Sequence, residues 1–163
     1  MLEETTKHKE LQNTAIRWLY ARGCCVFGQE VPTRYGGIAD AIGVVVRDER
    51  TVTPEGVRWL PKETVYYFEA KASRSDLICA KQKGIYENSI SPRLEKEFDF
   101  CYLIVADGVK VEPSLYPTWG VMTEHCEIIR RAKRQKRTQP ASIIIKNIAH
   151  VLVYKVFGKL YPH

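Results

Sequence analysis

The sequence lacks any segment that would take the chain into or across a membrane. No run reaches the roughly 18 apolar residues that a spanning helix needs, and the opening segment is acidic and polar, unlike a secretory signal. Internal repeats are absent as well. With 163 residues and 45% hydrophobic content, the chain is long enough for one domain, 1–163, with its own core. We expect a soluble, cytoplasmic protein.

Cysteines are few and show no pairing pattern. The chain has five, an odd number, and none of them form a C-x-x-C pair. Clustered ligands for zinc are not visible, and a disulfide framework is not expected in a cytosolic chain. We predict that Cys24, Cys25, Cys79, Cys101 and Cys126 are reduced and mostly buried.

The positive charge is concentrated in one short segment. The net charge is +6, and the segment 130–137 holds six cations and no acid: Arg130, Arg131, Lys133, Arg134, Lys136 and Arg137. The rest of the chain then has 19 basic residues against 19 acidic ones. Such a patch often contacts phosphate. A solvated linker between a hairpin and the last helix is an equally good interpretation.

Hydrophobic periodicity predicts an order of α-β-β-β-α-β, followed by a hairpin and a helix. The predicted helices cover 6–22, 73–88 and about 142–157, with a Ser73-x-x-Asp76 capping box at the start of the second. The predicted strands cover 24–32, 38–47, 65–72 and 98–106, with a hairpin of 119–123 and 127–130. We expect 48–63 to be a long hairpin loop, with a short strand around 57–60 as an alternative, and 89–97 to be a polar loop. A three-stranded antiparallel meander with a later strand beside it gives an α/β fold with a mixed sheet.

Three charged residues lie in runs that should be buried. Asp40 belongs to an apolar, β-branched run, and Glu69 and Lys71 belong to another. Since an unpaired buried charge is costly, we expect these groups to meet each other, a metal or a ligand. Side chains alternate along a strand, so Glu69 and Lys71 should point to the same face. A structural ion pair is the alternative for Asp40 and Lys71.

This arrangement resembles the PD-(D/E)xK nuclease superfamily, with Asp40 as the first acid, Glu69 as the second and Lys71 as the lysine. Residues 39–43 (ADAIG) and 69–77 (EAKASRSDL) look like its MmcB-like branch. The opening helix, from HKELQ at residue 8, is also similar to that of the VRR-NUC and archaeal Holliday-junction resolvase groups. The resemblance covers about residues 7–130 and implies a restriction-endonuclease-like core, followed by the basic linker 130–137 and the C-terminal helix.

The resemblance also implies a metal-dependent deoxyribonuclease. Asp40, Glu69 and the carbonyl of Ala70 would hold Mg²⁺ or Mn²⁺, which prefer hard oxygen ligands. Lys71 would orient the attacking water or stabilise charge on the scissile phosphate. A further acid usually assists, and two candidates stay open: Glu10 on the first helix and Glu30 near the end of the first strand. We rank His8 lowest, since a lone histidine on an apolar helix face is more often a hydrogen-bonded core residue.

Nucleic-acid contacts are predicted around the second helix. Gln82 and Tyr86 lie four residues apart, which resembles the Q-x-x-x-Y motif of RecB-type nucleases; a surface glutamine beside a core tyrosine is the alternative. Arg74, Lys81 and Lys83 could contact the phosphate backbone near the helix start, where free N–H groups favour anions. As helix-surface charges they need no such role.

The sequence leaves two other functions open. One is a nucleic-acid-binding module on the same fold with a catalytically weak site, and the other is a protein-interaction subunit whose last helix docks a partner. The preferred hypothesis is a DNA endonuclease in repair, recombination or mobile-element biology. Because two-strand cutting usually needs two sites, a homodimer through the apolar stripe of the last helix would fit.

Overall fold

The computed structural model describes residues 2–34, 37–82 and 97–160. Six strands form one mixed sheet in the order β1-β2-β3-β4-β5-β6. They are β1 (Val26–Pro32), β2 (Ile38–Thr53), β3 (Gly56–Lys71), β4 (Phe100–Val105), β5 (Gly120–Thr123) and β6 (Ile128–Arg130). The helices are α1 (Leu2–Ala21), α2 (Arg74–Gln82) and α4 (Ala141–Leu160). Among the described residues, no helix is long and apolar enough to span a bilayer.

Strand directions match the predicted topology. β1, β2 and β3 are an antiparallel meander, β4 runs parallel to β3, β5 runs parallel to β4, and β6 closes the far edge as an antiparallel hairpin strand. The prediction of a mixed sheet flanked by helices is therefore confirmed. The hairpin predicted over 119–130 is also confirmed, and the last helix is present with bounds a few residues wider than predicted.

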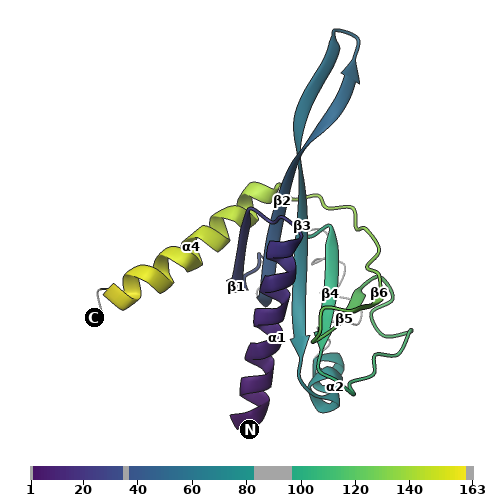
Figure 1. Ribbon diagram of the computed structural model, residues 1–163, viewed down its shortest axis with the longest axis vertical. Helices are drawn as coiled ribbons and strands as arrows, with labels where there is room; N and C mark the ends of the chain where they lie inside the picture. Colours follow the sequence, from purple (N-terminus) through teal and green to yellow (C-terminus); the bar gives the residue numbers. More distant parts are fainter. Residues whose placement is uncertain (1, 35–36, 83–96, 161–163) are drawn as a thin grey trace.

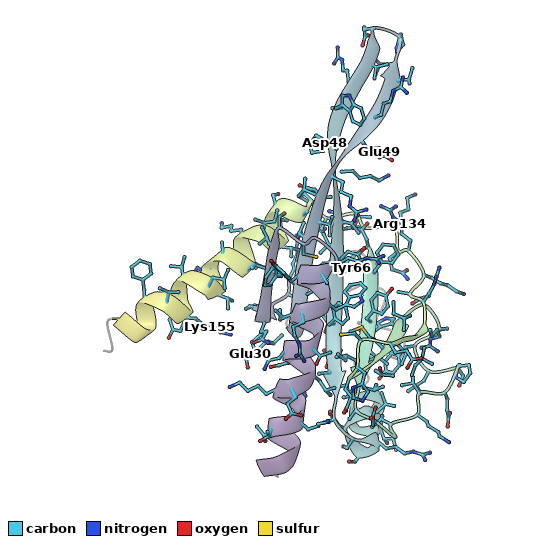
Figure 2. The ribbon with its side chains drawn as sticks, viewed as in Figure 1. Glu30, Asp48, Glu49, Tyr66, Arg134 and Lys155 are labelled. Atoms are coloured by element: carbon cyan, nitrogen blue, oxygen red, sulfur yellow. The ribbon has the colours of Figure 1, made fainter. Side chains whose placement is uncertain are left out.

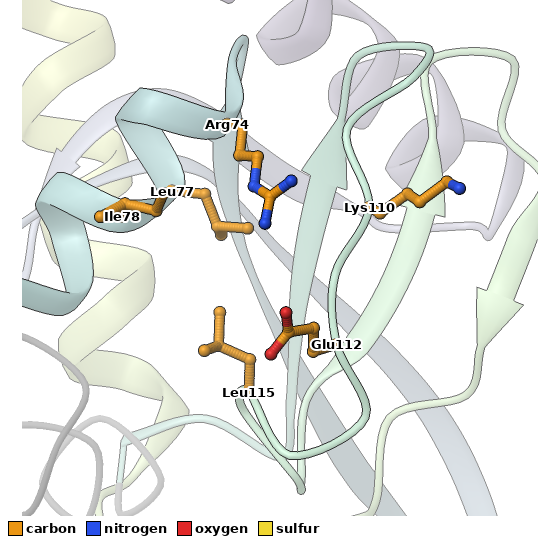
Figure 3. Close-up of a pocket in the computed structure, with 6 residues that line it drawn as sticks. All are labelled: Arg74, Leu77, Ile78, Lys110, Glu112 and Leu115. Carbon is orange, nitrogen blue, oxygen red and sulfur yellow. The ribbon is translucent and has the colours of Figure 1, made fainter.

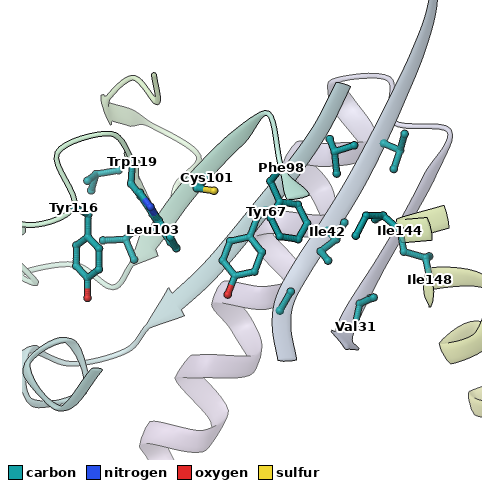
Figure 4. Packing of buried hydrophobic residues seen from close by; sticks show 14 of the residues in the cluster. Val31, Ile42, Tyr67, Phe98, Cys101, Leu103, Tyr116, Trp119, Ile144 and Ile148 are labelled. Carbon is teal, nitrogen blue, oxygen red and sulfur yellow. The ribbon is translucent and has the colours of Figure 1, made fainter. Parts of the chain in front are cut away.

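Two hydrophobic clusters cover the two faces of the sheet. On one face, α1 contributes Leu11, Ala15 and Leu19. They belong to one cluster with sheet residues such as Phe68 and Ile104. On the other, Ile144 and Ile148 of α4 join a cluster that includes Tyr67, Trp119 and Phe98 (Figure 4). At Gly43 a Cβ atom would lie 2.7 Å from Leu19 Cδ2, so this glycine lets α1 approach β2 closely. The sequence periodicity identified these elements because most of their apolar side chains are buried.

Most of the predicted loop over 48–63 is strand, although the hairpin and the strand near 57–60 are as predicted. β2 and β3 continue beyond the rest of the sheet as a long two-stranded ribbon that projects from the body and turns at residues 54–55 (Figure 1). The sequence pattern favours a loop here because the segment is rich in charge and contains Pro61, whereas strands inside a sheet are apolar. Pro61 is tolerated because both edges of a two-stranded ribbon are open, where an N–H group need not donate to a ladder.

Three smaller predictions also needed correction. The first helix begins at Leu2 rather than at residue 6, and the strand expected from residue 24 begins at Val26. Cys24 and Cys101 are buried, but Cys25 and Cys126 are exposed, and all four are free thiols. The second helix is described only to Gln82, so its predicted end at 88 and the loop 89–97 fall almost wholly outside the described residues.

Candidate active site

The candidate site lies where β2 begins and β3 ends. The antiparallel register pairs Ala41 with Phe68, which places Asp40 opposite Glu69 at the next position. Lys71 follows two residues later on β3, and α2 begins directly after it at Arg74. The strand alternation that predicted a shared face for Glu69 and Lys71 agrees with the geometry, because Lys71 Nζ lies 3.0 Å from Glu69 Oε1.

Asp40 is held by three donors. Its Oδ1 lies 2.8 Å from both His8 Nε2 and Gln12 Nε2, and its Oδ2 accepts a 2.7 Å hydrogen bond from the Ala70 N–H. Burial raises the pKa of this carboxyl, but the bonds from His8, Ala70 and Gln12 together outweigh burial and lower the pKa below its ordinary value. Asp40 is therefore an oriented carboxylate at neutral pH.

Glu69 is held differently. Its Oε2 accepts a 2.8 Å hydrogen bond from the Tyr67 hydroxyl, and its Oε1 accepts the bond from Lys71. Burial raises the pKa of Glu69, and the positive charge of Lys71 opposes that rise without cancelling it. The two acids of the site thus have pKa values displaced in opposite directions by their surroundings.

Lys71 is the cation of the site, with a side chain only 7% exposed. Burial lowers its pKa, but the negative charges of Glu69, Asp76 and Asp40 outweigh burial, so its pKa is raised and the ammonium persists at neutral pH. Asp76 Oδ1 lies 3.7 Å from Lys71 Nζ, and the other oxygen of Asp76 accepts the Ala72 N–H at 3.3 Å. Ser73 caps the N-terminus of α2, because its Oγ accepts a 3.1 Å hydrogen bond from the Asp76 N–H. The predicted helix start at Ser73-x-x-Asp76 is confirmed.

Neither predicted third acid joins this cluster. Glu10 is 62% exposed and pairs with Lys7. Since Glu10 is two residues from both His8 and Gln12, it lies about 200° around the helix from the residues that do reach Asp40. The prediction of Glu10 as a third acid of the site is therefore corrected, because the helix turns its side chain away from Asp40.

Glu30 is also directed away. Its backbone has φ 54°, a left-handed conformation that interrupts the alternation of β1, and its side chain is 61% exposed beside Lys155 Nζ at 3.2 Å. Figure 2 shows Glu30 and Lys155 next to each other, where α4 passes β1. Regular alternation would have turned Glu30 toward Asp40; the left-handed residue is a feature that the strand pattern does not reveal.

The sequence pattern does not reveal Gln12, Tyr67 and Asp76 as neighbours of the site, and it ranks His8 below the acids. His8 was ranked lowest, and Asp76 was assigned only a capping role. The signal available for α1 was the i, i+4 spacing of His8 and Gln12, which puts both on one helix face beside Leu11. The pKa of His8 is raised, chiefly by its hydrogen bond to Asp40, although partial burial opposes the shift.

The donor set fits a divalent cation such as Mg²⁺ or Mn²⁺. A carboxylate has about four acceptor positions, of which Asp40 uses three and Glu69 uses two. Ala70 directs its N–H toward Asp40, and since N–H and C=O of one strand residue point to the same side, its carbonyl oxygen faces Asp40 as well. Oxygen acceptor positions that no hydrogen bond uses remain on Asp40 and Glu69.

A pocket adjoins the start of α2 (Figure 3). It has a volume of about 220 Å³ and is lined by Arg74, Leu77 and Ile78 of α2 and by Lys110, Glu112 and Leu115 of the segment between β4 and β5. Arg74 points into it, as does Glu112 from the opposite wall. Lys83 and Tyr86 lie outside the described residues, and so do the side chains of Lys81 and Gln82, so the Q-x-x-x-Y prediction stays a prediction.

The basic run divides into two groups. Arg130 donates to the carbonyls of Trp119, Leu115 and Tyr116, and Arg137 donates to Asp99 Oδ2 at 2.9 Å. These hydrogen bonds within the chain give both arginines a structural role. Their predicted contact with phosphate stays a prediction. The four others are exposed: Arg131, Lys133, Arg134 and Lys136. The segment is not a free linker, because the Lys133 and Gln135 N–H groups bond to the carbonyls of Thr118 and Asp99.

A second cluster of acids with a histidine forms where the β5–β6 turn meets the residues after β4. One ligand atom from each of Asp107, Glu124 and His125 falls within 4.8 Å of the others. Glu124 already pairs with Lys7 at 2.8 Å and accepts the Asp107 N–H at 3.0 Å. These mutual contacts account for the cluster without an ion.

Comparison with known proteins identifies the fold and no family. No protein-family model matches the chain, and no curated protein matches it. Among solved structures it is similar to the SPO1766 protein of unknown function from Silicibacter pomeroyi, with 22% identity and a TM-score of 0.58. The similarity covers 88% of this chain and 84% of that one, so the two share an overall architecture.

Proposed function

We propose that this chain is a metal-dependent nuclease of the PD-(D/E)xK type that hydrolyses phosphodiester bonds in DNA. The observation that carries the proposal is the opposition of Asp40 and Glu69 across two strands, with the Lys71 ammonium bonded to Glu69. Two carboxylates and a buried lysine at the end of a sheet are the groups that such hydrolysis requires.

Each residue has a role that its contacts support. Asp40, Glu69 and the Ala70 carbonyl would hold Mg²⁺ or Mn²⁺, which when bound polarises the phosphate and favours loss of a proton from the attacking water. His8 and Gln12 fix the orientation of Asp40, and Tyr67 fixes that of Glu69.

Lys71 supplies a persistent positive charge beside the reacting phosphate and can orient the water through a free N–H. The start of α2, with Arg74 and the neighbouring Lys110, offers cations to the adjoining phosphates. A role in DNA repair, recombination or mobile-element biology is part of this proposal.

The test is cleavage of single-stranded, duplex, flap and four-way-junction DNA with Mg²⁺ or Mn²⁺, beside EDTA. Asp40→Asn keeps the shape of the side chain and removes the charge. Asp107→Asn makes the same change in the exposed second cluster. We expect cleavage that depends on metal, is lost in Asp40→Asn and persists in Asp107→Asn. Equal cleavage by all three proteins would assign the activity to a contaminant or another site.

A second function is favoured by one observation: both oxygens of Asp40 and of Glu69 already accept hydrogen bonds. Such a site is held together without an ion and could persist in a nucleic-acid-binding module that does not cut. Salt-dependent binding to the same DNA panel, without cleavage under either metal, is the result that would select this function.

A further inference from the structure

The β2–β3 ribbon is an arm with no other element beside it. Pairing of β1 with β2 ends at Val44, and pairing of β4 with β3 begins at Tyr66, so the two strands beyond these points pair only with each other. Figure 1 shows the ribbon projecting well past the body of the molecule. A two-stranded ribbon is marginally stable in water unless something packs on it.

One face of this ribbon carries most of its exposed apolar side chains, together with the charged residues Asp48, Arg50 and Glu63. The register pairs Val52 with Val57 and Arg50 with Trp59, and alternation along the strands puts Val46 on the same face. Val52 is 74% exposed and Trp59 is 65% exposed. The opposite face carries polar pairs such as Lys62 with Glu49, whose atoms lie 2.7 Å apart. We refer to Val46, Val52, Val57 and Trp59 as the ribbon patch.

The second half of α4 has a matching feature. Ile144 and Ile148 in the first half are buried against the sheet, whereas apolar residues of the following turns are exposed, among them Leu152, Val153, Tyr154 and Val156. Figure 1 shows this half of α4 extending away from the sheet. A surface helix normally shows an apolar stripe on one side and polar residues on the other, so an exposed apolar segment indicates a partner. We refer to these four residues as the helix patch.

We propose that the chain forms a two-fold symmetric dimer in which the helix patch of each copy packs on the ribbon patch of the other. A two-fold axis makes this contact twice, so both patches of both copies are covered at once. The ribbon and the second half of α4 leave the body in different directions, so each of them is accessible to a second copy (Figure 1).

The area of the two patches matches what a stable dimer needs. From the exposed fractions of their residues, each patch exposes roughly 400 Å² of surface, or roughly 800 Å² per chain, which is of the order that each partner buries in a standard interface. Either patch paired only with its own copy would bury half of that amount, which is in the range of weak contacts. Area therefore favours an interface that uses both patches.

Charge favours pairing of the helix with the ribbon rather than helix with helix. The sequence of α4 contains Lys146, His150, Lys155 and Lys159 and no acid, so two such helices side by side would bring like charges together. The ribbon between residues 46 and 63 holds four acids and four bases. It presents acids to the lysines of α4 without adding net positive charge.

The test measures the oligomeric state of the full chain by sedimentation velocity from low to high micromolar concentration. Val153→Glu places a charge in the helix patch, and Trp59→Glu places one in the ribbon patch. Both positions are exposed, so each monomer should remain folded, as a melting curve will verify. We expect a dimer for the wild type and dissociation constants raised roughly tenfold or more in each variant, because each contact then buries a charge. Ile129→Glu, at an exposed apolar position outside both patches, is the matched control and should leave the dimer intact.

Mixing the two variants distinguishes the reciprocal contact from other dimers. In a mixed dimer, one contact combines the two altered patches and the other combines two unaltered patches. The mixture should therefore associate more tightly than either variant alone. If Val153→Glu dissociates the dimer and Trp59→Glu does not, the helices pair with each other and the proposal is overturned. It is equally overturned by a wild-type chain that stays monomeric, or by one that floats with vesicles containing anionic lipid instead of dimerising.

Discussion

The ammonium of Lys71 lies 3.0 Å from Oε1 of Glu69, two residues earlier on the same strand, and both side chains are largely buried. An exposed counterpart exists on the ribbon, where Lys62 Nζ lies 2.7 Å from Glu49 Oε2. The two pairs have the same chemistry at different depths, and they should behave differently when the lysine is removed.

Lys71→Met should lower the free energy of unfolding by about 3 kcal/mol, because it leaves Glu69 buried without its cation. Lys62→Met should change it by less than about 1 kcal/mol, since surface pairs contribute little. Chemical denaturation of the metal-free proteins measures both. Equal losses would show that burial does not distinguish the two pairs.

The same Lys71→Met variant separates catalysis from metal binding. Lys71 is not among the oxygen ligands, so the variant should bind Mn²⁺ within a few-fold of wild type while cleavage falls by about a hundredfold or more. Binding is measured by calorimetry and cleavage by single-turnover assay. Equal losses of binding and rate would remove Lys71 from the chemical step.

Tyr67→Phe should shift the pH dependence of metal binding. The Tyr67 hydroxyl bonds to Glu69 and lowers its pKa, against the rise caused by burial. Without the hydroxyl the pKa of Glu69 rises further, so protons compete with the metal up to a higher pH. We expect Mn²⁺ affinity below wild type on the acidic side and equal to it at high pH, measured by titration from pH 5 to 8. A parallel loss at every pH would indicate a change of shape instead.

The fold could be predicted from sequence wherever burial imposes a period. The strands around Ala41, Phe68 and Leu103 are apolar because helices or loops cover them, and the pattern located each one. The ribbon was missed because it is exposed on both faces, and its backbone pairing leaves no hydrophobic period strong enough to identify.

The central acids and the lysine of the candidate site were identified because charges in apolar strands are conspicuous. Glu10 and Glu30 were wrongly added because their positions depend on helix phase and on one left-handed residue. His8 and Gln12 reach Asp40 only through the packing of α1 across the sheet, and such a long-range contact leaves no local pattern.

Within the basic run, Arg137 and Lys136 should have separable effects. Arg137 is largely buried and pairs with Asp99, which also accepts the Val65 N–H, so Arg137→Met should destabilise the fold by about 3 kcal/mol. Lys136 is exposed, and Lys136→Met should leave stability unchanged.

If DNA is bound, the salt dependence counts the cations that take part. Four exposed cations would give a slope of log affinity against log salt of about −3.6 on duplex DNA, and Lys136→Met would reduce the slope by about 0.9. Filter binding between 50 and 200 mM salt, a range of roughly fourfold, resolves these values. A flat dependence in the wild type would exclude the basic run from DNA contact.

His8 should make the stability of the metal-free protein depend on pH. Its folded pKa is raised by the bond to Asp40, so the stabilisation is fully present below the unfolded value of about 6.5 and is lost as pH rises through the folded pKa. The difference in unfolding free energy between wild type and His8→Gln, measured in EDTA, should therefore be larger at pH 6 than at pH 8.5. Because His8 is about one-third exposed, the change should stay below about 1 kcal/mol. His150→Gln, at an exposed position on α4, is the matched control, and an equal pH dependence there would show that the effect does not come from the bond to Asp40.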